Sequence, residues 1–494
     1  MTDSTQATCS HSRRLLILAI CCMSLLIVGL DTTIVNVALP SIRRELSASV
    51  SGLQWTIDAY TLVLASLLMI SGSTADRIGR RRVFQIGLFV FSLGSLLCGL
   101  APSLPALIGF RVLQAIGGSM LNPVAVSIIR NVFEDPRERA QAIGLWGAVF
   151  GLSMALGPVL GGALVDGVGW RAVFFVNVPI GVAAIALTAL FVPESRAQRP
   201  RRLDPVGQLL VTAALALLTY SIIQAPRHGW TSPETLGLFA GALVAFVVLI
   251  VYELHRRDPL IELRFFRSAP FSGASAIAVL AFAAQGGFLF LNTLYLQEVR
   301  HFSPLHAGLY ILPMAGMQLL FAPLSGWMVG RVGSRPSLLI AATAVTAAAV
   351  MLTRLTPTTP TGYLLASYVL FGIGFGLVNP PITDTAVSGM PSSQAGVAAA
   401  VASTSRQVGV TLGVAVLGAI AGGALSGTLG PSFVQASHSA WTVVAVLGVA
   451  MFVIGALTTT RWARATADRT AHALSERRPA LPLTAQAADH AGSR

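Results

Sequence analysis

Lysine is absent from this 494-residue chain, and all 33 of its basic residues are Arg. Without Lys, no G-x-x-x-x-G-K-[ST] phosphate loop can form, which argues against ATP hydrolysis by this chain. Acidic and basic residues together make up only 11% of the sequence, against roughly 25% in an ordinary soluble domain. A protein surface so poor in charge is not suited to face water.

Cysteine is also scarce, and metal-ligand patterns are missing from the sequence. Of the four Cys, Cys21, Cys22 and Cys98 lie inside apolar runs and Cys9 lies in the polar start, so no disulfide framework is indicated. The eight His show no ligand spacing, and neither H-E-x-x-H nor C-x-x-C occurs. We therefore expect neither a metal site nor a cofactor.

Long apolar runs dominate what remains, since 54% of the residues are hydrophobic and the mean hydropathy is +0.73. Each run is near the ~20 residues that a helix needs to cross ~30 Å of hydrocarbon. The first run exceeds twenty residues and has no A-x-A site after it, so we interpret it as a retained span and not as a signal peptide. The fourteen runs lie near 15–40, 51–72, 83–101, 105–129, 140–165, 170–192, 206–225, 235–253, 271–296, 305–328, 336–354, 362–386, 395–421 and 438–460.

Arginine is distributed unevenly among the segments that connect these runs. Fourteen spans place both termini on one side, and the segments on that side hold 25 Arg, whereas the opposite loops hold 6. The remaining two, Arg111 and Arg406, lie inside runs. By the positive-inside rule, we expect both termini to be cytoplasmic. The net charge of +13 then reports membrane orientation, and no nucleic-acid partner is expected.

An internal repeat divides the chain. Residues 72–81 and 326–335 share the pattern G-x-x-x-x-R-x-G-x-R, and Asn122-Pro123 late in the fourth run recurs as Asn379-Pro380 late in the twelfth. Runs 1 to 6 therefore correspond to runs 9 to 14, and runs 7 and 8 form a central insertion. We predict an all-α integral membrane protein of two pseudo-symmetric six-helix bundles in a 6+2+6 order. The predicted divisions are a cytoplasmic N-terminus (1–14), an N-terminal bundle (15–192), a linker with two extra spans (193–270), a C-terminal bundle (271–460) and a disordered cytoplasmic tail (461–494).

The connection after the second run, Gly72-x-x-x-Asp76-Arg77-x-Gly79-Arg80-Arg81, resembles the signature loop of the major facilitator superfamily. The resemblance covers roughly residues 15–460. It implies that the acid caps a neighbouring helix and that the loop latches the two halves together on the cytoplasmic side in one state. Physically, Gly permits a tight turn, and an acid stabilises a helix N-terminus. The alternative is an Arg-rich topological anchor, and both roles are compatible. The expected gating residues are Gly72, Asp76, Arg77, Gly79, Arg80 and Arg81.

Two further motifs resemble a subgroup of that superfamily. The stretch from Leu30 to Pro40, L-D-x-T-I-V-N-V-A-L-P, looks like the signature of the fourteen-span drug:proton antiporters. In the fifth run, Ser153 begins a stretch that resembles the motif of antiporters rather than importers, although Gly is expected at its position. Small residues allow close helix approach and Pro bends the helix, so plain helix packing is the alternative. The motif residues are Gly157, Pro158, Gly161 and Gly162.

Acidic residues inside the runs are candidates for proton coupling, because a charge in a helix centre costs at least ~2.5 kcal/mol. From the rise of ~1.5 Å per residue, Asp31 and Asp58 lie at similar depths in the outer half, and we expect them to line one cavity. A desolvated carboxylate beside a second acid can bind and release a proton as access alternates. The alternative for Asp31 is capping of a bent helix. For Asp58 it is a place in an aromatic belt beside Trp55 and Tyr60.

Arg111, in the R-x-x-Q-x-x-G-G stretch of the fourth run, resembles a second motif of the superfamily, in which a buried Arg is linked to proton transfer. A guanidinium can hold a nearby carboxylate ionised until a proton or the substrate changes the pairing. The alternative is a snorkelling Arg near the outer end of its span. Arg406 in the thirteenth run and Asp384 at the end of the twelfth are interpreted as structural.

These features predict proton-coupled efflux of small, lipophilic drug or antibiotic molecules across the bacterial cytoplasmic membrane by alternating access. The expected partners are a small-molecule substrate, protons and the lipid bilayer, and a monomer is expected to function because one chain contains both halves. An importer or uniporter on the same fold is the alternative, since it needs no antiporter motif. An enzyme is not expected, because the sequence shows neither a catalytic constellation nor a sizeable soluble domain.

Overall fold

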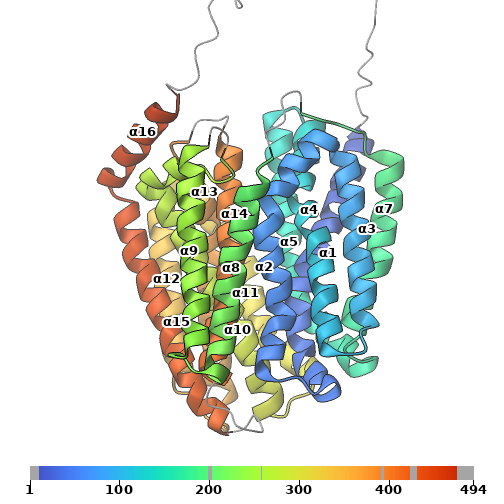
Figure 1. The fold of residues 1–494 in the computed structure, drawn as a ribbon, viewed down its shortest axis with the longest axis vertical. Helices are drawn as coiled ribbons and strands as arrows, with labels where there is room; N and C mark the ends of the chain where they lie inside the picture. Colours follow the sequence, from blue (N-terminus) through green and yellow to red (C-terminus); the bar gives the residue numbers. More distant parts are fainter. Residues whose placement is uncertain (1–10, 198–202, 257–258, 391–393, 423–430, 476–494) are drawn as a thin grey trace, which may run out of the picture.

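The computed structural model describes residues 11–197, 203–256, 259–390, 394–422 and 431–475, which form helices and short connections (Figure 1). The first half contains α1 (His11–Leu46), α2 (Val50–Ile78), α3 (Arg80–Gly99), α4 (Leu104–Val132), α5 (Pro136–Gly167), α6 (Ala172–Phe175) and α7 (Asn177–Phe191). In the centre are α8 (Pro205–His228), α9 (Pro233–His255) and the 3-10 helix η1 (Leu263–Arg267). The second half contains α10 (Ala269–Leu294), the π-helical turn η2 (Tyr295–Val299), α11 (Pro304–Val332), α12 (Ser334–Leu352), α13 (Thr361–Val387), α14 (Ala395–Gly422) and α15 (Pro431–Thr458), and α16 (Arg461–Ser475) follows it.

Short polar residues and Pro set several helix starts. Asp135 accepts hydrogen bonds from two backbone N–H groups in the first turn of α5, both at 2.9 Å. Ser232 and Ser303 cap α9 and α11 in the same way, and Pro follows each of these caps at the first helical position, where its missing N–H costs nothing. Between α2 and α3 the backbone of Gly79 has φ +127°, which L side chains rarely adopt, so the tight turn of the 72–81 motif requires Gly there.

Fourteen helical segments among the described residues are long and apolar enough to cross a membrane, which confirms the predicted number. The sixth is formed by α6 and α7, and the ninth by α10 and η2. On α9, Leu243, Val244 and Phe246 are 63%, 60% and 52% exposed, as expected of a surface that contacts lipid and not water. The prediction of an all-α membrane protein is therefore confirmed.

Helix α1 is longer than its apolar run. It spans 36 residues, or about 54 Å at ~1.5 Å per residue, which exceeds the hydrocarbon layer. Arg43 and Arg44, which the sequence had suggested were in a loop, lie in its last turn, and Pro40 is accommodated inside the helix. The helix continues because its charged last turn extends past the apolar layer, where charged side chains are solvated.

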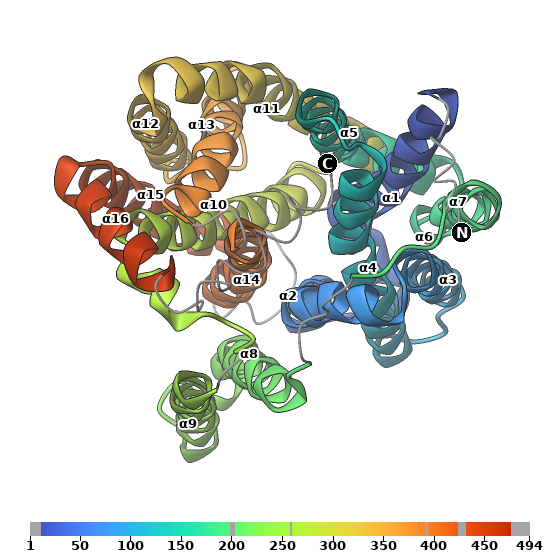
Figure 2. The ribbon, with the colours of Figure 1, turned by 90° about the horizontal axis from the view of Figure 1, so that it is seen from above.

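The two halves pack their helices in the same way. In the first half, α1 packs on α5, α2 and α3 pack on α4, and α3 packs on α7. The counterparts in the second half are α10 on α14, α11 and α12 on α13, and α12 on α15. The halves meet where α2 packs on α14 and where α5 packs on α11, and Figure 2 shows these two seams from above. This is the arrangement expected of two related six-helix bundles.

The inserted pair α8 and α9 lies outside the two bundles (Figure 2). Helix α8 packs on both α2 and α14, whereas α9 packs chiefly on α8. The insertion therefore covers one of the two seams between the halves. We call the side of the molecule on which α1 begins the Arg-rich face, after the arginine count of its segments, and the opposite side the Arg-poor face.

The prediction that residues 461–475 are disordered is wrong. They form α16, which lies at the Arg-rich face near the top of Figure 1 and packs on α10 and η1. Ala463, Ala467 and Leu474 are buried, and the Thr466 hydroxyl accepts a hydrogen bond from the Ala269 backbone N–H at 2.9 Å. The buried positions 463, 466, 467, 470 and 474 recur at helical spacing, but all except Leu474 are Ala or Thr, so the stripe is only weakly hydrophobic and is easily overlooked in the sequence. The tail beyond 475, and Cys9, lie outside the described residues.

Candidate functional site

A cavity of about 590 Å³ lies between the two halves. Helices α2, α4, α5, α10, α13 and α14 form most of its wall, together with the segments before α8 and after α9. Several lining residues, Asp76, Arg130, Asp204 and Pro259 among them, lie at helix ends on the Arg-rich face, so the cavity lies on that side of the molecule. Its volume falls in the range of roughly 300–1,000 Å³ typical of small-molecule sites.

The cavity wall combines apolar and polar side chains. Trp146, Phe150 and Phe282 provide large apolar surfaces. Asn122 of α4 and Asn379 of α13, the two repeat positions found in the sequence, both contribute to the wall. The repeat thus places matched amide groups on opposite sides of one cavity. This composition suits a ligand that is mainly apolar and carries a few hydrogen-bonding groups.

Asp31 and Arg111 form a buried ion pair in the first half, with Arg111 Nη1 2.5 Å from Asp31 Oδ2. Both residues are at most 1% exposed. The guanidinium also donates to the Thr56 carbonyl oxygen at 3.1 Å and lies over the Tyr60 ring, 4.1 Å from its centroid. Arg111 is therefore enclosed, and the snorkelling alternative is wrong. Asp31 faces α4 and does not cap its own helix.

Amide and hydroxyl groups complete the surroundings of Asp31. Gln114 donates from Nε2 to Asp31 Oδ1 at 2.8 Å, and Asn177 of α7 donates to the same oxygen at 3.4 Å. Both amides also donate to the Ser95 hydroxyl of α3, at 3.2 and 3.1 Å. Sequence reasoning did not assign Asn177 or Ser95 to the site. Their signal was weak, because each is one polar residue in an apolar run, and only the fold brings them to Asp31.

Asp58 lies at the seam between the halves. It is fully buried, and neither carboxyl oxygen forms a hydrogen bond of good geometry among the described residues, although the Thr61 hydroxyl acts on the carboxyl group from one turn further along α2. The spacing of residues 54, 58 and 61 places them on one face of α2. Gln54 donates to the Val414 and Ala415 carbonyls of α14 at 3.1 and 2.9 Å, and Thr61 accepts from the Thr411 hydroxyl at 2.8 Å. Asp58 therefore faces α14 between two polar links.

The expectation that Asp31 and Asp58 line one cavity is not met. Neither residue belongs to the wall of the 590 Å³ cavity. Arg111 turns Asp31 toward the interior of the first bundle, and Asp58 points into the closed seam with α14. The similar depth inferred from the sequence does not make the two acids neighbours, because depth does not fix the face of the helix.

The 72–81 motif connects to its own half in this structure. Asp76 accepts from Arg80 one turn later, at 3.0 Å, whereas the N-cap of α3 is Gly79, without a side-chain hydrogen bond. The backbone N–H groups of Arg80 and Arg81 donate to the Ser195 carbonyl at 2.9 Å and to Glu194 Oε1 at 3.1 Å, both in the segment after α7. Gly72 and Asp76 also line the cavity. These contacts tie the motif to the segment after α7 at the place where Gly72 and Asp76 line the cavity.

The fifth-span motif packs α5 against helices of both halves. A Cβ at Gly157 would lie 1.9 Å from Thr33 Oγ1, and one at Gly161 would lie 2.7 Å from the Ile34 side chain, so these two Gly let α5 approach α1. Gly162 meets α11 of the other half, where a Cβ would lie 2.5 Å from the Pro304 carbonyl oxygen.

The partner glycine on α11 completes this contact, since a Cβ at Gly308 would lie 2.3 Å from the Pro158 carbonyl oxygen. The motif thus forms a backbone-to-backbone contact between the halves.

Further links close the Arg-poor face. Gln297 of η2 donates to the Val37 carbonyl of α1 at 2.9 Å, and the Leu305 N–H donates to Asp166 of α5 at 2.9 Å. Arg43 lies 3.5 Å from Glu298 across the same face. With the cavity on the opposite side, the described residues show a conformation that is closed at the Arg-poor face.

Arg406 of α14, interpreted from sequence as structural, is part of the cavity wall. Its Nη2 donates to the Thr383 hydroxyl of α13 at 2.6 Å, and its guanidinium carbon lies 6.0 Å from the Phe282 ring centroid. Asp384 instead accepts from the Ser334 hydroxyl at 2.6 Å. In the part of the chain that is described, no three His, Cys, Asp or Glu side chains gather as metal ligands.

Known proteins resemble this chain over most of its length. The chain is 37% identical to the multidrug resistance protein Stp of Mycobacterium tuberculosis over 84% of this chain and 77% of that protein. It is 38% identical to the tetracenomycin C resistance and export protein of Streptomyces glaucescens over 81% and 74%. It is 34% identical to a methylenomycin A resistance protein of Streptomyces coelicolor over 84% and 89%.

Solved structures share the fold at low sequence identity. A peptide transporter, POT, in complex with sulfate superposes with a TM-score of 0.66 at 15% identity, covering 92% of this chain and 95% of that one. A bacterial homologue of the human lysosomal transporter Spinster, in an inward-facing and occupied conformation, gives 0.63 at 19% identity over 93% and 98%. Residues 21–414 match the sequence profile of the Major Facilitator Superfamily. With this match, the fourteen spans and the two related bundles, the chain belongs to the Major Facilitator Superfamily of membrane transporters.

Proposed function

We propose that this protein exports small, lipophilic drug or antibiotic molecules from a bacterial cytoplasm in exchange for protons. The names of its relatives, which describe resistance to and export of such compounds, support the efflux part of the proposal. The observation that carries the proton part is Asp58, an acid that is fully buried without a countercharge or a well-formed hydrogen bond among the described residues, at a seam that must open during transport.

Alternating access requires the two halves to separate at one face while they close at the other. In the structure the cavity lies toward the Arg-rich face, and Gly162 and Gly308 let the backbones of α5 and α11 touch near the Arg-poor face. We infer that substrate enters the cavity from the Arg-rich side. It leaves when the contact between α5 and α11 opens.

Proton coupling follows from what this opening does to Asp58. A carboxylate buried without a hydrogen-bond partner is costly, so we expect Asp58 to be uncharged while the seam with α14 is closed. When the seam opens, water reaches the carboxyl group and ionisation becomes favourable. Asp31 differs, because Arg111 and two amide donors surround its carboxyl group. We propose that Asp58 carries the proton and that the pair formed by Asp31 and Arg111 responds to it.

Everted vesicles that hold an acid-inside gradient test the proposal. Addition of a transported compound collapses the gradient in wild-type vesicles, and Asp58→Asn abolishes the collapse at equal protein level. Glu234→Gln is the matched control, because Glu234 is an exposed acid that pairs with His228 at the Arg-poor end of α9. If Asp58→Asn exchanged protons like wild type, the assignment of Asp58 would be wrong.

The same vesicles separate antiport from an importer or uniporter. In an antiporter, labelled compound accumulates inside everted vesicles only while the proton gradient lasts. Accumulation that is independent of the gradient, or that occurs only in right-side-out vesicles, would favour the alternative.

We also propose that the Arg-rich face is cytoplasmic and that the monomer is functional. The arginine asymmetry supports the first statement, and the presence of both halves in one chain supports the second. A C-terminal fluorescent fusion that needs the cytoplasm to fold tests the orientation. Transport by single copies reconstituted at low protein-to-lipid ratio tests the oligomeric state.

A further inference from the structure

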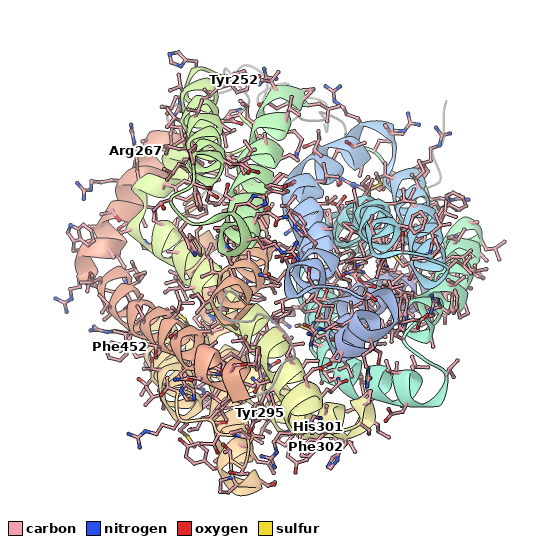
Figure 3. The ribbon with its side chains drawn as sticks, turned by 60° about the horizontal axis from the view of Figure 1, so that its bottom comes forward. Tyr252, Arg267, Tyr295, His301, Phe302 and Phe452 are labelled. Carbon is pink, nitrogen blue, oxygen red and sulfur yellow. The ribbon has the colours of Figure 1, made fainter. Side chains whose placement is uncertain are left out.

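The inserted pair α8 and α9 brings two acids together at the Arg-rich face. Asp204 precedes α8, and Glu253 lies in the last turn of α9, close to Tyr252 and Arg256. Figure 3 shows Tyr252 on the side of the molecule away from Tyr295 and Phe302. Neither acid belongs to the network around Asp31 or to the seam that contains Asp58.

Asp204 is 2% exposed and makes several contacts. Its Oδ1 accepts from the Gly207 backbone N–H and from the Tyr252 hydroxyl, both at 3.0 Å. Its Oδ2 lies 3.1 Å from Arg256 Nε, but the geometry of this contact is not that of a hydrogen bond. One oxygen of Asp204 is therefore satisfied, and the other has only an ionic contact.

Glu253 is 3% exposed and only half satisfied. Its Oε2 accepts from the Leu260 backbone N–H at 2.9 Å, and the Ile261 backbone N–H also acts on the carboxyl group, whereas Oε1 forms no hydrogen bond of good geometry among the described residues. A Cβ placed on Gly207 would lie 2.4 Å from Glu253 Oε1 and 2.8 Å from Asp204 Oδ2. The two oxygens left without hydrogen bonds thus converge over one glycine, where a like charge nearby disfavours ionisation of Glu253.

Among the described residues, negative charges outnumber positive charges around Asp204 and Glu253. Asp204 and Arg256 are the charged groups that act on Glu253. Glu262, just before η1, is paired with Arg264 at 3.6 Å. On the side that faces α2, the neighbouring contact is an uncharged hydrogen bond, which Gln208 donates to the Ser66 carbonyl at 2.5 Å. Among the residues that the structure describes, two ionised carboxylates would therefore share the guanidinium of Arg256, although both acids are almost fully buried.

We propose that Glu253, which lies beside Asp204, binds a proton and forms a second proton-binding site of the transporter, which the inserted helices contribute. A proton on Glu253 Oε1 supplies a donor where none exists, and Asp204 Oδ2 is the acceptor nearby. It also leaves one negative charge to balance Arg256. The site adjoins the cavity, because Leu203, Asp204, Pro259 and Leu260 form part of its wall. The proton can therefore exchange with the cavity that the substrate enters.

The proposal deepens the proposed proton antiport, but the proton on Glu253 is measurable without any transport. Infrared spectra of the full-length protein in lipid nanodiscs, recorded over a pH series, report protonated carboxyl groups. We expect a band that titrates in wild type, is missing in Glu253→Gln and is unchanged in Glu234→Gln. Glu253→Gln keeps a carbonyl oxygen to accept the Leu260 N–H, so the fold is expected to persist.

A second variant tests the pairing. Asp204→Asn retains Oδ1 as cap of α8, and it should shift the pH midpoint of the Glu253 band, because Arg256 then faces one carboxylate instead of two. A spectrum of Glu253→Gln identical to wild type would overturn the proposal, as would a midpoint unmoved by Asp204→Asn.

Transport data keep the two proposals apart. If the band titrates as described but no compound drives proton movement in vesicles, antiport fails and the proton site stands. If antiport is measured and Glu253→Gln retains the wild-type infrared spectrum, the site fails and antiport stands.

Discussion

Removal of one partner from the buried pair of Asp31 and Arg111 should be far more harmful than removal of both. At 2.5 Å and an effective dielectric constant of ~20, the attraction between the two charges is roughly 7 kcal/mol before desolvation is subtracted. Breaking such a pair on one side typically costs about 3–5 kcal/mol, because the other charge stays buried and unpaired. We therefore expect Asp31→Asn to destabilise the protein by about 3–5 kcal/mol.

The two single substitutions should differ. Asp31→Asn leaves a guanidinium that cannot lose its charge, although the Thr56 carbonyl and the Tyr60 ring still contact it. Arg111→Gln leaves a carboxylate that can take up a proton, so its cost should be lower. The double variant removes both charges and should recover much of the loss, with a coupling energy of about 2 kcal/mol or more.

The assay is unfolding of the purified protein in detergent, by melting temperature and denaturant titration, for wild type and the three variants. The expected order of stability is wild type, then the double variant, then Arg111→Gln, then Asp31→Asn. Additive losses in the double variant would refute the reasoning, because they would mean that the two side chains do not interact. Proton exchange by a stable double variant would show that the pair is structural and is not part of coupling.

Three further predictions address the seal, the seam and the tail. Gly162→Val places a side chain against the Pro304 carbonyl, so the Arg-poor face should not close. We expect a folded protein that does not transport, and weaker cross-linking between cysteines introduced on α5 and α11 than in the otherwise wild-type protein. Asp58→Asn keeps the seam uncharged at every pH, so the melting temperature should lose the pH dependence that this acid causes, and a profile like wild type would contradict the buried, unpartnered carboxyl. Leu474→Ala removes a side chain from the apolar cluster that includes Phe265, which should weaken the docking of α16 by roughly 2 kcal/mol. The effect is measured as earlier proteolysis of the tail, and Trp462→Ala, at an exposed position of the same helix, is the control.

The sequence was sufficient for the architecture because membrane spans leave a strong signal. Each run must supply about 20 apolar residues, and the arginine count fixes relative sidedness, so fourteen spans and their order can be read directly. The boundary of α1 was less certain, because its last turn, with Arg43 and Arg44, extends beyond the hydrocarbon. Helix α16 was missed because Ala and Thr form its buried face.

The site was harder to predict than the fold. Asp31, Asp58 and Arg111 could be found singly, since a charge inside an apolar run is conspicuous. Their partners depend on helix rotation and packing, which no local pattern specifies, so the pairing of Asp31 with Arg111 and the isolation of Asp58 emerge only in three dimensions. Glu253 is the last residue of the eighth run and Asp204 lies just before the seventh, so neither is conspicuous as a charge in the middle of a span, and only the fold brings the two acids together.

The repeat shows how coupling can be confined to one half. Tyr368 follows Arg111 by the same interval at which Asn379 follows Asn122, and so it occupies the matching place on α13. There its hydroxyl donates to Asn292 Oδ1 of α10 at 2.6 Å. A neutral hydrogen bond thus joins α10 and α13, whereas an ion pair joins their counterparts α1 and α4 in the first half. A neutral link carries no net charge, whereas an ion pair responds to a change of charge nearby. The two bundles therefore differ in their buried charge, and in the proposed antiport this difference is the reason why a proton on Asp58 would act on the first half and not on the second.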